Sequence, residues 1–536
     1  MTNIFLHSFL FLLIFYSHGL IFLKKLLKTK TNYNFFEICL IGLIVTLIIS
    51  PFINLFIPLN NLFILLNLSF LILFFIYNKD IFFENIKFNY KLFILLFSLV
   101  LLNIYGSGFS DDLDHYHYGF ITNSDELNTI LGNSFLHPLY GTSPVWLTGH
   151  SFFNFDHSRL TDIHILNGLL LFLILSTFIN ELIFDNKINN FLKKFLFSII
   201  LFIVIKYSRI KEFGIDKPAI LLFCFLIYCY LKFFFINKKG NEISNNFIIL
   251  FLISITIISI KIIYIPILIL PILIFFKQQK KINLRQNYIF IFIPISIFFI
   301  KNLSSSGCLI FPFEFTCLKF LPWSNYAGSV EFTFYNEVFN KSWTSYKGDL
   351  SEVEYIKNFN WFMTWLERGK IEILEYFFTL TFITFITYFI FKGGEKINAK
   401  FNILKISFVL IVVFSLLIYF IKNPVLRMNH HIFISLMLLF LLFYQSKKKF
   451  IRFKLLAKYV LILAIMFNIT KNFNRIYAND FRNNSYEAIS HKITKPQKKF
   501  LGDLEYYIGW YGKAPIGNQN LANKNYKEVY FFKVIY

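Results

Sequence analysis

The chain has 536 residues, of which 56% are hydrophobic and only 15% are charged, and its mean hydropathy is +0.59. Soluble domains carry about 25% charged residues, so this composition excludes an ordinary soluble protein. The formal net charge of +23 does not indicate nucleic-acid binding, because no basic patch interleaved with aromatics and no nucleic-acid motif accompanies it.

Apolar runs of about 15 to 25 residues recur along the chain and predict an all-α, polytopic membrane protein. A β-barrel would alternate apolar and polar positions, and the run at 247–276 shows no such alternation. We expect about fourteen membrane-spanning helices, within a range of about 12 to 15. They are expected near residues 1–23, 35–57, 60–78, 92–106, 163–182, 194–206, 218–236, 247–276 (two short helices), 287–300, 373–391, 405–421, 431–445 and 456–469.

Three regions follow from this pattern: an N-terminal three-helix extension at 1–90, a membrane core at 91–470 and a polar C-terminal tail at 471–536. Lysines gather in alternate connections between the apolar runs, and the positive-inside bias places these connections in the cytoplasm. Two large loops, 107–162 and 301–372, then lie on the outer face, where we expect short interfacial helices. The tail is also placed outside.

The most distinctive polar segment directly follows the apolar run at 92–105. Within seven residues it places three carboxylates and two imidazoles, namely Asp111, Asp112, Asp114, His115 and His117. Carboxylates at the end of a membrane helix carry a free-energy cost near lipid, so their presence suggests that they bind a cation or act as acid or base.

These acids admit three interpretations. Asp112 and Asp114 form a D-x-D pattern that can hold a divalent cation, Mg²⁺ or Mn²⁺, against a phosphate. Asp111 or Asp112 can instead act as general base toward an acceptor hydroxyl. A solvated, helix-capping acidic turn is the alternative without catalysis. We take all three acids as catalytic candidates.

Histidines are concentrated in the same outer segment. Six of the eleven in the chain lie there: His115, His117, His137, His150, His157 and His164. A closed zinc ligand set with fixed spacing is not visible in the sequence. Interfacial hydrogen bonding is therefore favoured, with His115 and His117 lining a substrate groove.

A second outer connection, at 206–218, carries charges of both signs. Arg209 and Lys211 can grip a phosphate, while Glu212 and Asp216 can balance them or bind a sugar hydroxyl. A salt-bridged loop without substrate contacts explains the same residues equally well.

Two single cations complete the set of candidates. Lys261 interrupts an apolar stretch and is expected at the outer turn between two short helices, as a phosphate ligand or as a snorkelling side chain. Arg427 lies in a short outer turn and can make a bidentate contact with a phosphate or serve as an interfacial anchor.

The five cysteines do not form a metal site. Cys39, Cys224 and Cys229 fall inside apolar runs, as packing residues do. Cys308 and Cys317 flank a polar loop, and they are candidates for a disulfide if this loop faces an oxidising compartment.

Taken together, these features resemble the GT-C superfamily of integral membrane glycosyltransferases. The chain is more closely similar to a group of bacterial multi-pass membrane proteins without an assigned function, over roughly residues 90–440. The motifs that carry this similarity are Asp111-Asp112-Leu113-Asp114-x-Tyr116-His117, Lys211-Glu212-Phe213-Gly214-x-Asp216, Lys261, Ser306-Gly307-Cys308-Leu309-Ile310-Phe311-Pro312 and Pro424-x-x-Arg427.

The resemblance implies a donor sugar linked to polyprenyl phosphate and an acidic catalytic motif in the first large outer loop. The expected activity is transfer of this sugar to an envelope glycan, lipid or protein. It would take place on the periplasmic face of the bacterial inner membrane, with Lys261 and Arg427 on the phosphate. The alternatives are a transporter or flippase for lipid-linked saccharides, which would place charges deep within helices, and a polymerase of such saccharides.

Overall fold

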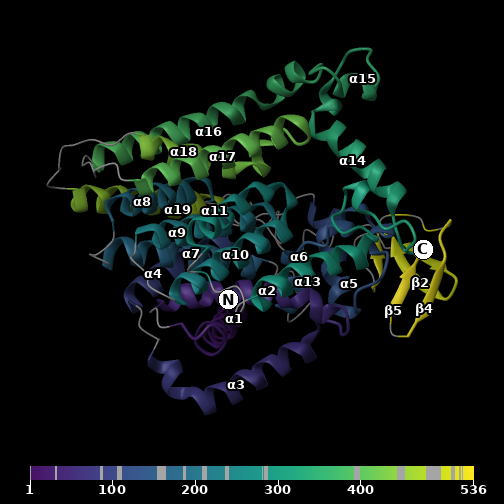
Figure 1. Ribbon diagram of the computed structural model, residues 1–536, viewed down its shortest axis with the longest axis horizontal. Coiled ribbons are helices and arrows are strands. Elements are labelled where there is room, and N and C mark those ends of the chain that lie inside the picture. Colours follow the sequence, from purple (N-terminus) through teal and green to yellow (C-terminus); the bar gives the residue numbers. More distant parts are fainter. Residues whose placement is uncertain are drawn as a thin grey trace.

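The computed structural model is an assembly of helices with a small β-structure near the C-terminus (Figure 1). It describes residues 2–29, 33–84, 89–105, 112–153, 164–184, 189–207, 214–235, 241–279, 282, 288–391, 399–443, 453–477, 497–508, 514–517, 519, 521, 523–530 and 532–536.

The first half of the chain alternates long apolar helices with shorter helical elements. Its elements are α1 (Thr2–Leu20), η1 (Ile21–Leu26), α2 (Phe35–Asn54), α3 (Asn61–Glu84), α4 (Tyr90–Tyr105), η2 (Leu113–His117), α5 (Tyr118–Glu126), η3 (Asn133–Phe135), η4 (Pro138–Thr142), α6 (Val145–Phe152), α7 (Ile165–Phe184), α8 (Asn190–Lys206), α9 (Asp216–Phe235) and α10 (Asn241–Ile260).

The second half continues the helices and ends in strands. Its elements are η6 (Ile262–Leu268), α11 (Ile269–Gln278), α13 (Ile289–Ser306), η8 (Glu314–Thr316), α14 (Tyr326–Asn340), η9 (Trp343–Ser345), α15 (Glu352–Ile356), α16 (Phe362–Ile390), α17 (Ala399–Ile421), η10 (Leu426–Met428), α18 (His430–Phe443), α19 (Phe453–Tyr477), β1 (Gln497–Leu501), β2 (Leu504–Ile508), β3 (Ile516–Gly517), β4 (Tyr526–Val529) and β5 (Phe532–Ile535).

The helical class expected from the sequence is therefore observed. Among the described residues, ten helices are long and apolar enough to cross a membrane, and three shorter apolar helices accompany them, at Tyr90–Ile104, Ile262–Gln278 and His430–Phe443. A chain with this many apolar helices is a membrane protein of the helical class. The number fourteen stays a prediction.

The N-terminal helices are packed into the bundle. Residues of α1 and α2 belong to the same buried apolar cluster as residues of α7, α9 and α10. The crossing of α1 and α2 is very close, because a Cβ added at Gly42 would lie 1.7 Å from the carbonyl oxygen of Phe15. Small residues allow such close crossing of membrane helices. Helices α1 and α2 thus help to form the core, whereas the apolar span of α3 is only 11% buried within the protein.

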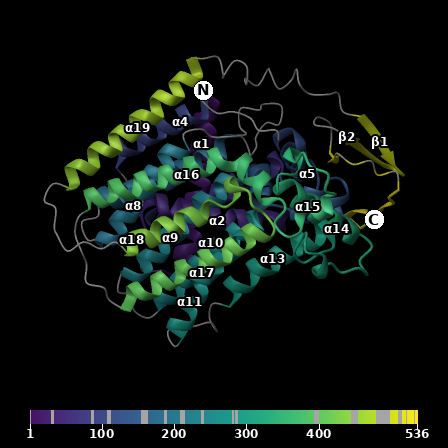
Figure 2. The same cartoon turned by 90° about the horizontal axis from the view of Figure 1, so that it is seen from above.

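The elements outside the bundle gather at one end of it. Both views show α14, α15 and the strands beyond the same end, the right-hand end in Figure 1 (Figures 1 and 2). The start of α9 lies at this end too, since Ile215 packs against an outer cluster that contains Leu113 and Leu504. We call this end of the bundle the site end.

Candidate functional site

Three charged residues that the sequence placed in separate connections meet at the site end. Asp216 is the first residue of α9, and its Oδ1 forms an ion pair with Lys261 Nζ. Its Oδ2 lies 3.9 Å from Arg427 Nε. The cluster of these three side chains holds two cations and one carboxylate, so its formal charge favours an anionic ligand.

Local chain geometry explains how Lys261 reaches this cluster. Helix α10 ends at Ile260, and Lys261 has an extended backbone before η6 begins at Ile262. The run at 247–276 therefore breaks at the lysine, as the sequence predicted. A carboxylate in the first turn of α9 also interacts favourably with the helix dipole, which fits Asp216 at this position.

Solvent exposure differs among the three side chains. Lys261 is 13% exposed, Asp216 is 31% exposed and Arg427 is 56% exposed. Lys261 is therefore held by the protein, whereas the guanidinium of Arg427 remains accessible and can turn toward an incoming group. Guanidinium groups suit phosphate and carboxylate oxygens because they can donate two parallel hydrogen bonds.

A layer of aromatic and histidine side chains lies beside the cluster. Tyr207 Oη and His430 Nδ1 are 3.0 Å apart, and the ring of Tyr376 lies 4.7 Å from that of His430. Lys206 Nζ lies 4.1 Å from the centre of the Tyr376 ring and 2.7 Å from Glu375 Oε1. This layer was not predicted from the sequence. Lys206 ends α8 and Tyr207 follows it, Tyr376 lies within α16, and His430 begins α18, so only the packed bundle brings them together.

The loop that carries Arg427 is fastened from two sides. Trp365 Nε1 of α16 donates a 2.5 Å hydrogen bond to the carbonyl of Pro424. Lys422 Nζ pairs with Glu337 Oε2 of α14 at 2.6 Å, and Lys341 Nζ pairs with Oε1 of the same carboxylate at 2.6 Å. The connection between α13 and α16 thus supports the arginine loop.

The acidic motif lies next to this cluster, but the structure describes it only in part. Asp112 is the residue before η2, where its side chain makes no capping hydrogen bond among the described residues, and Asp114 lies within η2. Asp111 lies outside the described residues. The choice between general base, metal ligand and a solvated acidic turn stays a prediction.

His117 links the motif to the ion pair. It is 1% exposed, and burial lowers its pKa to about 3. The charge on Asp216 raises this pKa, while the charges on Lys261 and His115 lower it, so the imidazole lies within electrostatic range of the cluster. His117 is consequently neutral near pH 7. His115 is exposed, and its ring meets that of His137 edge to face at 5.1 Å.

The remaining predicted residues cannot be placed in the same way. Arg209, Lys211 and Glu212 lie outside the described residues. Within the part of the chain that the structure describes, no group of three or more His, Cys, Asp or Glu side chains could hold a metal ion. A divalent cation on Asp112 and Asp114 stays a prediction.

Cys308 and Cys317 form a disulfide in the connection between α13 and α16. This pair is the one that the sequence offered as a candidate. Cys39 and Cys224 are buried thiols within helices.

Comparison with known proteins identifies a family but no function. A family model described as a domain of unknown function, DUF8201, matches residues 1–433. The chain belongs to the DUF8201 family. No curated protein and no solved structure matches the chain. The family match contains α1 and α2 as well as Asp216, Lys261 and Arg427, and it ends before α19 and the strands.

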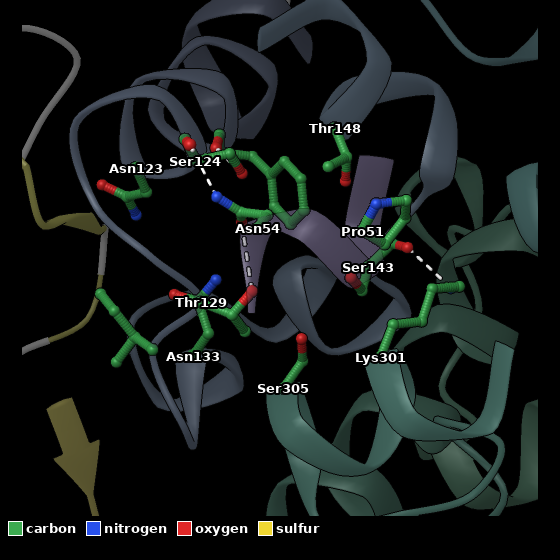
Figure 3. A pocket seen from close by; sticks show the side chains of 12 residues that line it. Pro51, Asn54, Asn123, Ser124, Thr129, Asn133, Ser143, Thr148, Lys301 and Ser305 are labelled. Atoms are coloured by element: carbon green, nitrogen blue, oxygen red, sulfur yellow. Dashed lines mark hydrogen bonds between the residues drawn. The ribbon is translucent and has the colours of Figure 1, made fainter. Parts of the chain in front are cut away.

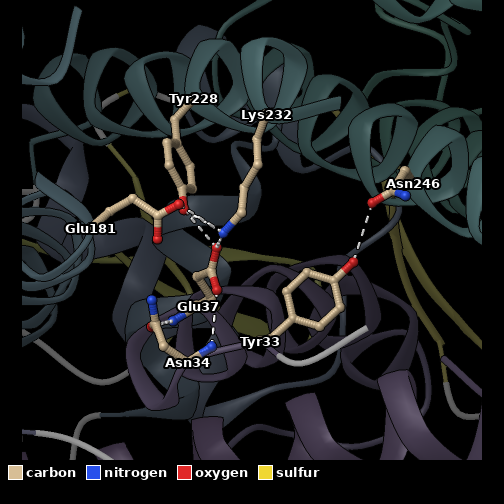
Figure 4. A network of polar contacts seen from close by, with 7 residues as sticks. All are labelled: Tyr33, Asn34, Glu37, Glu181, Tyr228, Lys232 and Asn246. Carbon is tan, nitrogen blue, oxygen red and sulfur yellow. Dashed lines mark hydrogen bonds and ion pairs between the residues drawn. The ribbon is translucent and has the colours of Figure 1, made fainter. Parts of the chain in front are cut away.

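A second ion cluster lies inside the DUF8201 region, toward the other end of α9 (Figure 4). Lys232 Nζ lies 2.7 Å from Glu37 Oε1 and 3.2 Å from Glu181 Oε1. Tyr228 Oη donates to Glu37 Oε1 at 2.8 Å, and the other oxygen of Glu37 accepts a hydrogen bond from the Asn34 amide at 2.9 Å. This cluster was not predicted from the sequence, although Glu37, Glu181 and Lys232 each lie within an apolar run, where charged residues are rare.

A cavity of about 20 Å³, enough for one water, lies at the site end between α2, α5, α6 and α13 (Figure 3). Amides and hydroxyls line it, including those of Asn54, Asn133 and Ser305. Buried Lys301 borders it and donates to the carbonyls of Ser143 at 2.7 Å and Thr142 at 3.2 Å. None of the residues predicted from the sequence lines this cavity, and it is too small for a sugar.

Proposed function

We propose that this DUF8201 protein is a membrane glycosyltransferase that moves a sugar from a polyprenyl-phosphate donor to an acceptor glycan, lipid or protein of the cell envelope. The observation that carries the proposal is the meeting of Asp216, Lys261 and Arg427 beside the segment with Asp112. Two cations near a carboxylate-bearing turn can serve a reaction whose leaving group is a phosphate.

Each residue has a distinct role in the proposed reaction. Lys261 and the accessible Arg427 bind the donor phosphate, and Asp216 keeps the two cations aligned before the donor arrives. Asp112 accepts the proton of the acceptor hydroxyl. In the alternative role, Asp112 and Asp114 would hold a divalent cation, which would supply Lewis-acid stabilisation of the phosphate charge. The acceptor oxygen then bonds to the anomeric carbon, the bond from that carbon to the phosphate oxygen breaks, and the lipid phosphate leaves with its charge neutralised by the cations.

The reaction is proposed to occur on the outer face of the bacterial inner membrane. In this topology α8 joins the ten long and three shorter apolar helices as a fourteenth crossing. The site end is then outside, with the disulfide of the α13–α16 connection in the oxidising compartment.

Cysteine labelling tests this orientation. Phe320 lies in the α13–α16 connection and Gln279 follows α11, and both are exposed. A membrane-impermeant maleimide should label Phe320→Cys in intact cells and Gln279→Cys only after permeabilisation, in a background with Cys229→Ser. Labelling of both from the same side would overturn the orientation.

The alternative function is transport of a lipid-linked saccharide. The buried cluster of Lys232, Glu37 and Glu181 favours it, because charges within membrane helices often mark transport pathways. Both carboxylates are nevertheless paired with Lys232. A polymerase of lipid-linked saccharides would use the same site-end cations and differs from the main proposal in the acceptor.

Substitution of the acid tests the enzyme proposal. Asp112→Asn keeps the shape and removes the charge, so transfer of radiolabelled sugar from the lipid donor should fall by about a hundredfold, the scale of general acid–base catalysis. Asp111→Asn and Asp114→Asn are measured beside it. Glu314→Gln, an exposed acid in the disulfide loop, is the matched control. Wild-type turnover in all three Asn variants would show that the acidic motif is not catalytic.

A further inference from the structure

The C-terminal segment at 497–536 lies beyond the family match and has a fold of its own. Strands β1 and β2 pair antiparallel, β3 joins β2 in parallel, and β4 with β5 forms a separate hairpin. We call these strands with their connections the strand segment. The sequence predicted only a polar tail there, whereas the structure holds this segment in place by contacts with other parts of the chain.

Backbone hydrogen bonds join the strand segment to the outer loop that follows α5. The amide of Leu131 donates to the carbonyl of Lys533 at 2.9 Å, and the amide of Ile535 donates to the carbonyl of Leu131 at 3.0 Å. Leu131 thereby pairs with Val534 as a bridge of parallel type. The amide of Gln519 adds a bond of 3.2 Å to the carbonyl of Leu136.

The buried side chain of Asn123 in α5 makes two hydrogen bonds to the backbone of Ile516, the first residue of β3. Its Oδ1 accepts from the amide of Ile516 at 2.7 Å, and its Nδ2 donates to the carbonyl of the same residue at 2.9 Å. Close packing accompanies these bonds, because a Cβ added at Gly119 would lie 3.3 Å from the Ile516 side chain. A neighbouring contact joins the amide of Ala514 to Glu126 Oε2 at 2.9 Å.

The strand segment and the acidic motif also share one apolar core. The buried cluster contains Leu113 and Tyr116 of η2 together with Leu504 and Tyr506 of β2. Ile215, directly before Asp216, packs against the same cluster. Asp112 precedes Leu113, so the strand segment packs against the residue that directly follows Asp112 in the acidic motif.

The backbone form of η2 favours stabilisation by tertiary contacts such as those with the strand segment. It is a π-helical turn, a rare form that occurs as short pieces, frequently at functional sites. Such a turn depends on tertiary contacts rather than on its own propensity. Without the strand segment, Leu113 and Tyr116 would lose part of their apolar contacts and the turn would open more easily.

We infer that the strand segment is a structural part of the site that positions the acidic motif, and that Asn123 is the positioning residue that fastens it. The docking itself is independent of the reaction, whereas its importance for turnover rests on the proposed function. The strand segment must then lie on the same side of the membrane as the acidic motif.

Hydrogen exchange of the full-length protein in detergent tests the docking. Asn123→Ala removes both bonds to Ile516, so amides at 112–126 and 514–517 should exchange at least about tenfold faster, the effect of about 1.4 kcal/mol of lost local stability. Asn67→Ala in α3, which removes a bond to the Phe63 carbonyl within its own helix, is the control and should leave these amides unchanged. Unchanged exchange at 112–126 in Asn123→Ala would overturn the inference.

A cross-link separates positioning from a general loss of structure. Leu131 and Val534 are bridge partners, so cysteines at both positions can join the outer loop to β5 covalently. In the Asn123→Ala background this cross-link should restore slow exchange at 112–126 and recover the lost sugar transfer. The same background without the new cysteines controls for effects of the oxidant.

The possible outcomes distinguish the two proposals. Faster exchange in Asn123→Ala with wild-type transfer would disprove the positioning role. The expected exchange and cross-linking in a protein that transfers no sugar at all would leave the docking intact and overturn the proposed function.

Discussion

Helix α9 takes part in an ion cluster near each of its ends, and the two clusters differ in access and in charge. Asp216 and Lys232 are sixteen positions apart in the sequence, which corresponds to roughly 24 Å along a helix. At the site end two cations share one carboxylate, and Arg427 is 56% exposed. At the other end two carboxylates share one lysine, and Glu37 and Glu181 are 4% and 7% exposed.

This difference distinguishes a candidate binding site, at Asp216, from a structural ion cluster, at Lys232. The inner cluster is buried, its two carboxylates share Lys232, and Tyr228 donates a further hydrogen bond to Glu37; these contacts join α2, α7 and α9. The cluster at the site end keeps an accessible guanidinium and an excess of positive charge. Breaking a buried ion pair between helices is strongly destabilising, whereas an accessible cation near a partly buried ion pair can bind an anion.

The largest effect is expected from breaking the inner cluster. Lys232→Met leaves two buried carboxylates without a cation and should cost about 3–5 kcal/mol of stability. Thermal unfolding in detergent measures this loss, and Lys261→Met should lower stability much less because Asp216 keeps Arg427 nearby. The triple variant Glu37→Gln, Glu181→Gln, Lys232→Met should recover much of the stability. Equal melting temperatures for Lys232→Met and the wild-type protein would remove the distinction between the clusters.

The next effect concerns activity at the site end. Lys261→Met and Arg427→Met each remove a charge-assisted hydrogen bond to the phosphate, worth about 1.5–3 kcal/mol. Sugar transfer should therefore fall about tenfold to a hundredfold while the protein still folds. Lys347→Met, an exposed lysine of the outer connection, should keep full transfer. The proposed roles are wrong if the two site variants behave like this control.

A pH dependence of stability is expected at the site end. Burial lowers the pKa of His117 and of His137 to about 3, from an unfolded value of 6.5. Between these values the unfolded state binds more protons, so stability is lost as pH falls below about 6.5 and further until about 3. Protection factors at 112–126, which are corrected for the intrinsic pH dependence of amide exchange, should fall across this range as pH is lowered. His117→Phe should reduce the pH dependence, and an identical profile in this variant would contradict the assignment.

The smallest effect is expected from the aromatic layer. Tyr207→Phe removes only the hydrogen bond to His430 Nδ1 and should cost about 0.5–1.5 kcal/mol. The melting temperature should fall slightly, with no change in the oligomeric or membrane state. Phe202→Leu, a packing change in the same helix, provides a comparison. A destabilisation as large as that of Lys232→Met would show that the contacts at the site end contribute as much to stability as the inner cluster does.

Hydrophobic patterning was sufficient to predict the helical class and several local features. The apolar runs predicted helices, and Lys261 predicted the break after α10. The position of Cys308 and Cys317 on either side of a polar loop made them candidates for the disulfide that the structure contains. Each of these features depends on neighbours in the sequence. The ion pairs of Asp216 could not be predicted, because they join residues from three connections that approach one another only in the packed bundle.

The sequence by itself determined that the chain is rich in membrane-type helices and which polar residues interrupt them, since both follow from the cost of placing polar groups in lipid. Only the tertiary structure decided which of these residues meet. It separated the open cluster at Asp216 from the paired cluster at Lys232, and it packed the strand segment against the acidic motif through Asn123. These contacts depend on long-range packing, where side chains far apart in the chain compensate one another's charge and burial.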